Sequence, residues 1–327
     1  MQKIVNNLCQ NLYNYKNYKN YKNYNNYKTI KPINIQLVLD SGAFSGSYIL
    51  GGLLYIKQLE KNNIVSVQKI SGSSVGSLLG FLYFTDKLNI VSKYFKTIKK
   101  SFSQKGNLSL LKKILKKIID TIPLSNISSL NDKLFISFFD VNLSKQIVLS
   151  TFNKKTLLNS LLRSSHIPFI SDGNLLNNKK YIDGLYPYFF KQQKDTYIIF
   201  MNLWSYYHFD MFYIKNETNN DARILEGIIQ THHFFFHFYH KDTICKKSKL
   251  CFLYNTMTYY DLLLLYFRIY LLHFFVYIFH WVVYVLKFYG FEKDDNFKPN
   301  LLHQKWFHSI KQVIVNSISI ICFYFLT

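Results

Sequence analysis

Residues 35–76 read IQLVLDSGAFSGSYILGGLLYIKQLEKNNIVSVQKISGSSVG, and this stretch decides the fold class. Its two short apolar runs, at 35–40 and 65–70, are each bounded by a glycine-containing turn, which is typical of buried strands. Each turn leads into a segment whose apolar residues recur at helical spacing. The order strand, helix, strand, helix predicts an α/β sandwich with a mostly parallel sheet.

The second turn, residues 72–76, reads GSSVG and fits the pattern G-x-S-x-G. In this pattern a nucleophilic serine lies on a tight, strained turn between strand and helix, where larger side chains in place of Gly72 and Gly76 would clash. A serine at a helix N-terminus also faces backbone N–H groups that stabilise developing negative charge. The motif in this context predicts that Ser74 is a catalytic nucleophile.

The first turn, Ser41–Gly46, is a second cluster of small residues after a strand. Its backbone N–H groups, together with that of Val75, are candidates for binding the oxyanion of a tetrahedral intermediate. A nucleotide-phosphate loop is the rival interpretation. It fails because both the G-x-G-x-x-G pattern and the P-loop lysine are missing.

Three later stretches complete a recognisable order: FISFFDVNLSKQIVLST at 135–151, LLRSSHIPFI at 161–170 and YIDGLYP at 181–187. In this order the chain resembles the patatin family over roughly residues 34–205. In that family a glycine-rich oxyanion loop follows the first strand and a G-x-S-x-G serine follows the second. A D-G-G or D-G-A turn then carries the catalytic aspartate.

The resemblance implies a fold and a set of roles. The fold is a three-layer α/β/α sandwich with a mostly parallel central sheet, followed here by an apolar helical tail. Ser74 is the nucleophile and Asp183, followed by Gly184, is the base. The implied substrates are phospholipids or other glycerolipids, and no metal or other cofactor is expected. The oxyanion loop comprises Gly42, Ala43, Phe44 and Gly46.

Departures from the family pattern leave a second interpretation open. Ser41-Gly42-Ala43 replaces the triple glycine, Ser45 replaces the basic residue before the last glycine, and Leu185 follows Asp183-Gly184. We expect the alanine to be tolerated if its φ angle is negative. The alternative is a catalytically inactive patatin-like protein that serves as a membrane-bound interaction module.

Other residues compete for the role of the base. Asp172, in the sequence SDG, is closer to Pro168 than the family pattern suggests, so Asp183 is preferred. His166 is a candidate third member of the site, although a packed helix residue is the simpler interpretation. A Ser–His–Asp triad would need a histidine after the acid, and the later histidines lie near or in the apolar tail.

The histidines at 232, 233, 237 and 240 and the cysteines at 245 and 251 include residue types that bind zinc. Their spacing matches no compact metal motif, so we expect no metal site. The four cysteines of the chain form no CxxC pair and indicate a reducing compartment rather than a disulfide framework.

The formal net charge of +22 is open to a nucleic-acid or anionic-membrane interpretation. The composition offers a simpler cause of this charge. Lys, Asn, Ile, Tyr and Phe are abundant throughout, and their codons are AT-rich, so an AT-rich genome would encode such a chain. Of the forty basic residues, only Arg163, Arg223 and Arg268 are arginine. Since nucleic-acid recognition favours arginine, we expect no nucleic-acid partner.

Three segments lie outside the strand-and-helix pattern of the core. Residues 1–32 contain a Tyr-Lys-Asn repeat and are expected to form a disordered tail before an acyl-hydrolase domain at 33–257. Residues 108–122 form an amphipathic helix, with leucine and isoleucine on one face and lysine on the other. We favour packing of its apolar face on the core over binding of its lysine face to a membrane.

The C-terminal segment, 258–327, is expected to associate with a membrane. Its run at 262–286 comprises 25 nearly continuous apolar residues, enough to cross a bilayer, with Arg268 able to reach one surface. Lysines at 241, 246, 247 and 249 precede this run. They favour a catalytic domain that faces the cytoplasm.

Overall fold

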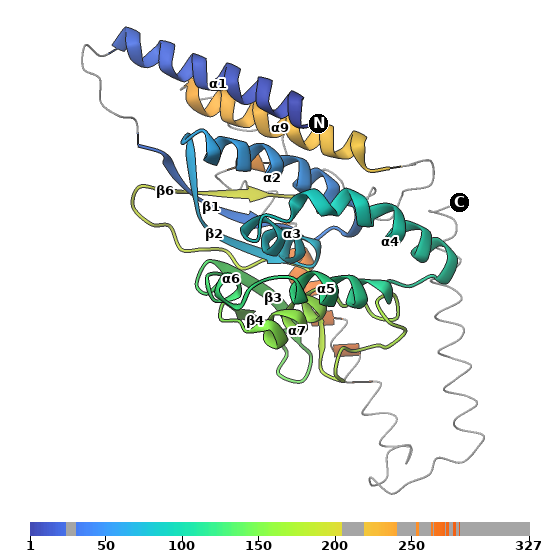
Figure 1. Ribbon diagram of the computed structural model, residues 1–327. Coiled ribbons are helices and arrows are strands. Elements are labelled where there is room, and N and C mark those ends of the chain that lie inside the picture. The colour runs from blue at the N-terminus through green and yellow to red at the C-terminus, as the bar shows by residue number, and fades with distance from the viewer. Residues whose placement is uncertain are drawn as a thin grey trace, which may run out of the picture.

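The structure, a computed structural model, describes residues 1–23, 31–204, 219–240 and 253–254, with 263, 265–271, 273–274, 277–278 and 281 (Figure 1). Within these residues a seven-stranded sheet has the order β4-β3-β2-β1-β6-β7, and β5 pairs with β3. The β1/β2, β1/β6 and β2/β3 pairs are parallel. The strands are β1 (Ile33–Leu39), β2 (Val65–Ser73), β3 (Leu134–Asp140), β4 (Lys145–Leu149), β5 (Tyr181–Asp183), β6 (Thr196–Met201) and β7 (Leu253–Tyr254).

Helices connect the strands, as the alternation in the sequence predicts. They are α1 (Gln2–Asn23), α2 (Gly46–Lys61), α3 (Val75–Phe84), α4 (Val91–Lys105), α5 (Leu110–Asp120), α6 (Leu124–Ser128), α7 (Lys154–Ser164) and α9 (Asp221–His240), with short 3-10 turns η1 (Ala43–Ser45) and η2 (Leu88–Ile90). The predicted fold class, a mixed α/β protein with a mostly parallel central sheet, is confirmed.

The two faces of the sheet are covered differently. Alternate residues of the central strands, such as Leu37, Ile136 and Met201, belong to the main hydrophobic core, which they share with residues of α2, α3, α5, α7 and α9. On the opposite face Val38 and Phe200 pack against aromatic side chains from the segment after β5. The period of two in the strands separates these environments.

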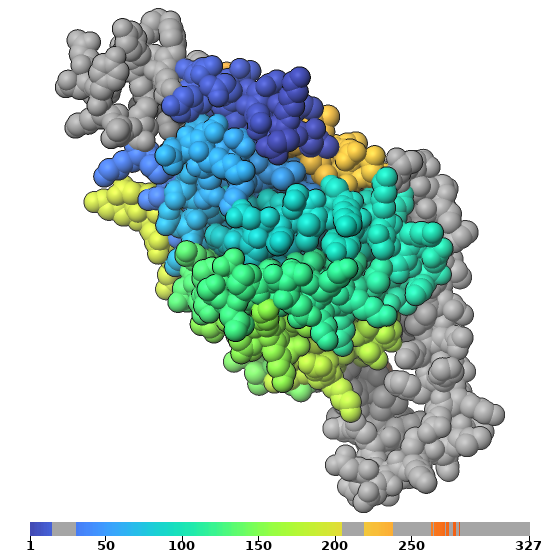
Figure 2. Space-filling view, viewed as in Figure 1, coloured from blue at the N-terminus to red at the C-terminus, as the bar shows by residue number. Residues whose placement is uncertain are grey.

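The N-terminal segment differs from the expected disordered tail. Residues 2–23 form α1, which packs on α2 and α9 (Figures 1 and 2). Val5, Cys9 and Leu12 are buried, and their spacing places them on one face of the helix. The prediction of disorder is wrong for these residues because this apolar stripe precedes the repeat and finds a partner surface. Residues 24–30 of the repeat lie outside the described residues.

The amphipathic segment forms α5, and its apolar face is buried on the core. Ile114, Leu115 and Ile118 are buried, whereas Lys112 and Lys116 are exposed. The favoured interpretation of this helix is therefore confirmed. Figure 2 shows that α4 and α5 lie side by side on one face of the molecule.

The predicted membrane span at 262–286 falls partly outside the described residues, as does the domain boundary at 257/258. Among the helices that the structure describes, none combines the length and the apolar character that crossing a bilayer requires. The described residues between 263 and 281 are helical. The expectation that Arg268 reaches a bilayer surface is wrong, because its side chain is buried and pairs with Asp40 at 2.7 Å.

Candidate active site

Strand pairing brings the serine and the aspartate together. Strand β2 pairs with β3 up to Ser73, which lies opposite Ser137. Strand β5 pairs antiparallel with β3, and its last residue, Asp183, lies opposite Phe138. Because β4 occupies the other edge of β3, strands β2 and β5 share one edge and meet end to end. The Ser74 turn and the Asp183 turn are therefore neighbours, although about a hundred residues separate them in sequence.

The Ser74 turn is strained and tightly enclosed. Ser74 adopts φ 52° and ψ −126°, a conformation that non-glycine residues rarely occupy and that is common at functional turns. A Cβ atom on Gly72 would lie 2.5 Å from the Gly76 carbonyl carbon and the Ser77 nitrogen. One on Gly76 would lie 2.5 Å from the Leu39 carbonyl oxygen. Both glycines are therefore required by close backbone approach, as the motif predicts.

A residue that the sequence interpretation missed holds the backbone of Ser74 in place. The Ser74 N–H donates to the Ser164 hydroxyl at 2.9 Å, and that hydroxyl donates to the Ser137 carbonyl at 2.7 Å. Ser164 is the last residue of α7 and is fully buried. It belongs to the LLRSSHIPFI stretch that supports the family resemblance, so a signal was present in the sequence without an assigned role.

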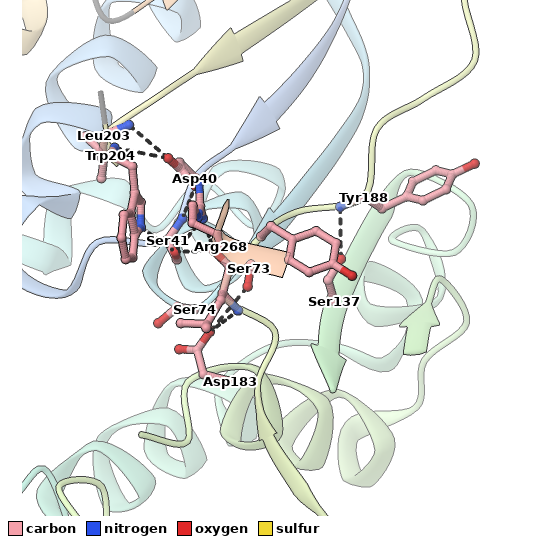
Figure 3. Close-up of polar contacts among 12 residues, drawn as sticks. Asp40, Ser41, Ser73, Ser74, Ser137, Asp183, Tyr188, Leu203, Trp204 and Arg268 are labelled. Carbon is pink, nitrogen blue, oxygen red and sulfur yellow. Dashed lines mark hydrogen bonds and ion pairs between the residues drawn. The ribbon is translucent and has the colours of Figure 1, made fainter. Parts of the chain in front are cut away.

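Asp183 is buried at the end of β5 and faces the serine turn (Figure 3). Its carboxylate accepts hydrogen bonds from the Ser74 side chain, from the Ser73 hydroxyl at 3.4 Å and from the Leu185 N–H at 2.8 Å. Burial raises the pKa of Asp183 to about 6, against the lowering effect of these hydrogen bonds and of the Arg268 charge. A carboxylate with this pKa is ionised at neutral pH and is a stronger base than an exposed aspartate.

The turn that begins at Ser41 contains a second strained residue. Ala43 has φ 43°, so the condition for an easily tolerated alanine, a negative φ angle, is not met. The Gly46 N–H donates to carbonyl oxygens of the same turn, those of Ala43 and Phe44. A Cβ on Gly46 would lie 2.3 Å from a Val75 methyl group, and one on Gly42 would lie 2.6 Å from Leu203. Gly42 and Gly46 are therefore needed for space.

An apolar cavity of about 160 Å³ opens beside Ser74. Ala43, Phe44, Gly46 and Val75, four of the five residues predicted for the oxyanion hole, line it together with the serine. Its remaining walls are mainly leucine, isoleucine and aromatic side chains of α3, α4 and α5. The buried face of α5 thus forms part of this cavity, through Leu111, Ile114, Leu115 and Ile118.

The competing residues lie elsewhere in the loop before β5. Asp172 is exposed, and its carboxylate accepts a hydrogen bond from the Asn174 N–H at 3.0 Å. His166 is buried, and its carbonyl oxygen accepts the Asp183 N–H at 2.9 Å. Burial lowers the pKa of His166, opposed by the Asp172 charge and by backbone groups of the 174–175 loop. His166 therefore contributes its backbone to the placement of Asp183.

The histidine-rich helix α9 contacts the core rather than the Ser74 turn. His232 Nδ1 lies 2.8 Å from the Tyr55 hydroxyl, and burial lowers the pKa of His232. His233 and His237 stack one turn apart on the same helix. In the parts of the chain that the structure describes, three or more metal-ligating side chains do not converge anywhere.

A polar network joins the Ser41 turn to the Asp183 turn (Figure 3). The Ser41 hydroxyl donates to the Leu185 carbonyl at 2.7 Å, and Asp40 accepts from the backbone of Leu203 and Trp204. Arg268 donates to Asp40, to the Ser41 hydroxyl and to the Leu185 carbonyl. None of these links was predicted from the sequence.

The fold and the site together define a class: a mixed α/β protein with a serine on a strained strand-to-helix turn, a buried carboxylate beside it and an apolar cavity. Residues 37–186 match the family model of patatin-like phospholipases, so this part of the chain is similar to a patatin-like phospholipase domain. The match includes Ser74 and Asp183, and it confirms the resemblance inferred from the motifs. It indicates a lipid hydrolase or esterase kind of activity, with a lipid substrate. No curated protein matches the chain significantly.

Proposed function

We propose that this domain is a serine lipid acyl hydrolase that cleaves acyl esters of phospholipids or other glycerolipids. Ser74 is the nucleophile and Asp183 is the base. The observation that carries the proposal is the hydrogen bond between the Ser74 side chain and the buried Asp183 carboxylate, beside an apolar cavity. The carboxylate is therefore within reach of the proton that it must accept.

The reaction follows from this geometry in two steps. In the first, Asp183 accepts the Ser74 proton as the hydroxyl oxygen attacks the acyl carbonyl, and the proton then passes to the departing alcohol. In the second, Asp183 accepts a proton from water, which attacks the acyl-enzyme. The bond to the Ser74 oxygen breaks, the fatty acid leaves and the proton returns to the serine.

Backbone N–H groups of Gly42, Ala43, Phe44 and Val75 are the proposed donors to the oxyanion in both steps. Val75 is the first residue of α3, so the positive end of the helix dipole acts on the same charge. Gly46 has a steric role instead, because its N–H is already committed within the turn.

The apolar cavity is the proposed binding site for the acyl chain. Its walls offer favourable contact to methylene groups, each worth about 0.8 kcal/mol when buried. Ile118→Trp places a larger side chain in the wall that α5 provides. We expect it to reduce hydrolysis of long-chain esters while short-chain esters are still cleaved. Equal losses on both substrates would place the acyl chain elsewhere.

Covalent labelling tests the nucleophile directly. The wild-type protein should react with a fluorophosphonate probe and release fatty acid from phospholipid, and Ser74→Ala should abolish both. Ser125→Ala, which removes an exposed hydroxyl on α6, is the matched control. If wild-type protein neither labels nor hydrolyses any lipid ester, the alternative of an inactive interaction module is the better account.

We also propose that the C-terminal segment holds the domain at a membrane surface, with the domain on the cytoplasmic side. The proposal is supported by the described helical residues of this segment, where large apolar side chains are exposed, among them Tyr266, Tyr270, Phe274 and Trp281. Tyrosine and tryptophan favour the bilayer interface. Tyr270→Glu with Phe274→Glu should reduce co-flotation with phospholipid vesicles. Leu124→Glu, at an exposed leucine of α6, should not.

A further inference from the structure

The three arginines of this chain have unusual positions. Lysine supplies the other 37 of the 40 basic residues. Arg163 lies over the Tyr181 ring at the start of β5, at 4.2 Å, and Arg223 Nη1 lies 3.5 Å from the Ser45 hydroxyl of the oxyanion turn. Arg268 pairs with Asp40. All three arginines therefore contact elements that carry the proposed site.

Arginine and lysine differ in ways that matter at such positions. The guanidinium group is planar, carries five N–H donors and stacks on aromatic rings, whereas an ammonium group is a compact point charge. Arg268 combines hydrogen bonding through its Nη2 atom with stacking on an aromatic ring. It donates to Asp40, Ser41 and Leu185, and its guanidinium lies 4.7 Å from the centre of the Trp204 ring.

The contacts of Arg268 lie on both sides of the proposed catalytic pair. Asp40 and Ser41 begin the oxyanion turn after β1, at 2.7 and 3.1 Å from the guanidinium. Leu185 follows Asp183 and Gly184, and its N–H donates to the Asp183 carboxylate. Arg268 thus joins the segment that holds the oxyanion donors to the turn that holds the base.

Burial makes this link costly to break. Arg268 is 2% exposed and Asp40 is 0% exposed. Removing one member of such a pair leaves the other as an uncompensated buried charge, whereas replacing both by neutral groups is much better tolerated. The link also depends on a residue far outside the family match at 37–186.

We propose that Arg268 is a positioning residue through which the C-terminal segment aligns the oxyanion turn with the Asp183 turn. The inference rests on the proposed function, because it assigns Arg268 a part in placing the base of that reaction. Arg268 itself does not touch the reacting atoms in this assignment; it acts through Ser41 and Leu185.

The charge of Arg268 should affect the pH dependence of the reaction. It lowers the pKa of Asp183, in opposition to burial. The other described groups that face this carboxylate, Ser73, Ser74 and the Leu185 N–H, are uncharged hydrogen-bond donors, and His166 offers Asp183 only its carbonyl oxygen. Because the base must be ionised, loss of the Arg268 charge should move the acid limb of the pH–rate profile to higher pH.

Two variants of the full-length protein separate charge from geometry, with a soluble short-chain nitrophenyl ester as substrate. Arg268→Met should raise the acid limb by about one pH unit, since the charge of Arg268 lowers the pKa of Asp183 and a nearby opposite charge shifts a carboxyl pKa by about that much. Arg268→Lys keeps the charge but has a shorter side chain and lacks the planar group that lies over Trp204. Its acid limb should stay near wild type while kcat falls roughly tenfold.

Controls keep the outcome decisive. Lys180→Met removes another cation paired with a buried aspartate, Asp140 at 3.0 Å, and should leave the acid limb in place. If Arg268→Met fails to fold, Asp40→Asn/Arg268→Met removes both charges and should still show the raised acid limb.

An acid limb and kcat at wild-type values in all the folded Arg268 variants would overturn the inference. Labelling of the wild type, with none in Ser74→Ala, shows independently whether the proposed function itself stands.

Discussion

The turns after β1 and β2 both connect a strand to a helix through strained backbone, but different groups enclose them. Both follow parallel strands, both lead into a helix and both hold a non-glycine residue at positive φ, Ala43 at 43° and Ser74 at 52°. The Ser74 turn is enclosed by backbone, since the positions where Cβ atoms would clash face carbonyl and amide groups. The Ala43 turn is enclosed by side chains, those of Val75 and Leu203.

This difference affects how each turn tolerates change. Backbone cannot move without shifting a strand or a helix, whereas a side chain can rotate to another rotamer. The Ala43 turn is also held by hydrogen bonds from Arg223 and Arg268, which come from distant parts of the chain. A turn enclosed by backbone therefore requires a fixed motif, while a turn enclosed by side chains allows the departures from the triple glycine seen here.

The largest effect is expected for Gly76→Ala. The new Cβ atom would lie 2.5 and 2.6 Å from the carbonyl oxygens of Leu39 and Asp40, both backbone atoms of β1 and its end. Overpacking against backbone should cost more than about 3 kcal/mol of unfolding free energy, the upper end for such changes. Urea denaturation measures it. Gly173→Ala is the control, with open space around the new Cβ atom and a cost of only about 1 kcal/mol from its positive φ.

Asp183→Asn, next to the Ser74 turn, should lower activity while it raises stability. Loss of the base should lower kcat by at least about a hundredfold. Stability should rise, because burial raises the pKa of Asp183 from 3.8 to about 6 and makes its ionised form costly in the folded state. At about 1.4 kcal/mol per pH unit, the gain at pH 7 is on the order of 3 kcal/mol.

The pH dependence gives the sign of this effect. A raised pKa in the folded state means that stability is lost as pH rises from about 4 through about 6. The stability difference between Asp183→Asn and the wild type should therefore be small at pH 4 and full at pH 7.5, measured by thermal unfolding. Asp172→Asn, at an exposed aspartate, should change neither activity nor stability appreciably. If Asp183→Asn kept the wild-type kcat, Asp183 would be excluded as the base.

Gly46→Ala should have a smaller effect than Gly76→Ala, because its obstacle is a side chain. The new Cβ atom would meet a Val75 methyl group at 2.3 Å, and rotation of that side chain relieves part of the clash. A cost of about 1–2 kcal/mol is expected. Gly46→Ala/Val75→Ala should recover most of it in urea denaturation. A double variant no more stable than Gly46→Ala would show that this turn, too, is enclosed by backbone.

The smallest effect is expected for Ala43→Gly. Left-handed backbone costs a non-glycine residue about 1–2 kcal/mol, and the greater freedom of glycine in the unfolded chain offsets part of the gain. The net stabilisation should be about 0.5–1 kcal/mol by urea denaturation, with labelling by fluorophosphonate retained. Destabilisation by this change would mean that the methyl group of Ala43 packs usefully against the cavity.

Much of the fold was predictable because its signals are local. The apolar runs of β1 and β2, the glycine turns and the helices that follow them depend on residues close together in sequence, as do Ser74 and the Asp183 turn. The helix α1 was missed although Val5, Cys9 and Leu12 have helical spacing. The neighbouring Tyr-Lys-Asn repeat indicated disorder for the whole segment. Only the structure shows that this apolar stripe packs on α2 and α9.

The sequence by itself determined the order of strands and helices and the residues that face each other in the proposed chemistry, because strained turns demand glycine at fixed spacing. Only the tertiary structure decided what supports them. The hydrogen bond from Ser74 to Ser164 and the buried pairing of Arg268 with Asp40 join residues up to 228 positions apart. The positive φ of Ala43 likewise became apparent only in the folded chain. Such contacts depend on how the packed elements meet in space, and no local pattern in a single sequence indicates which distant residues will meet.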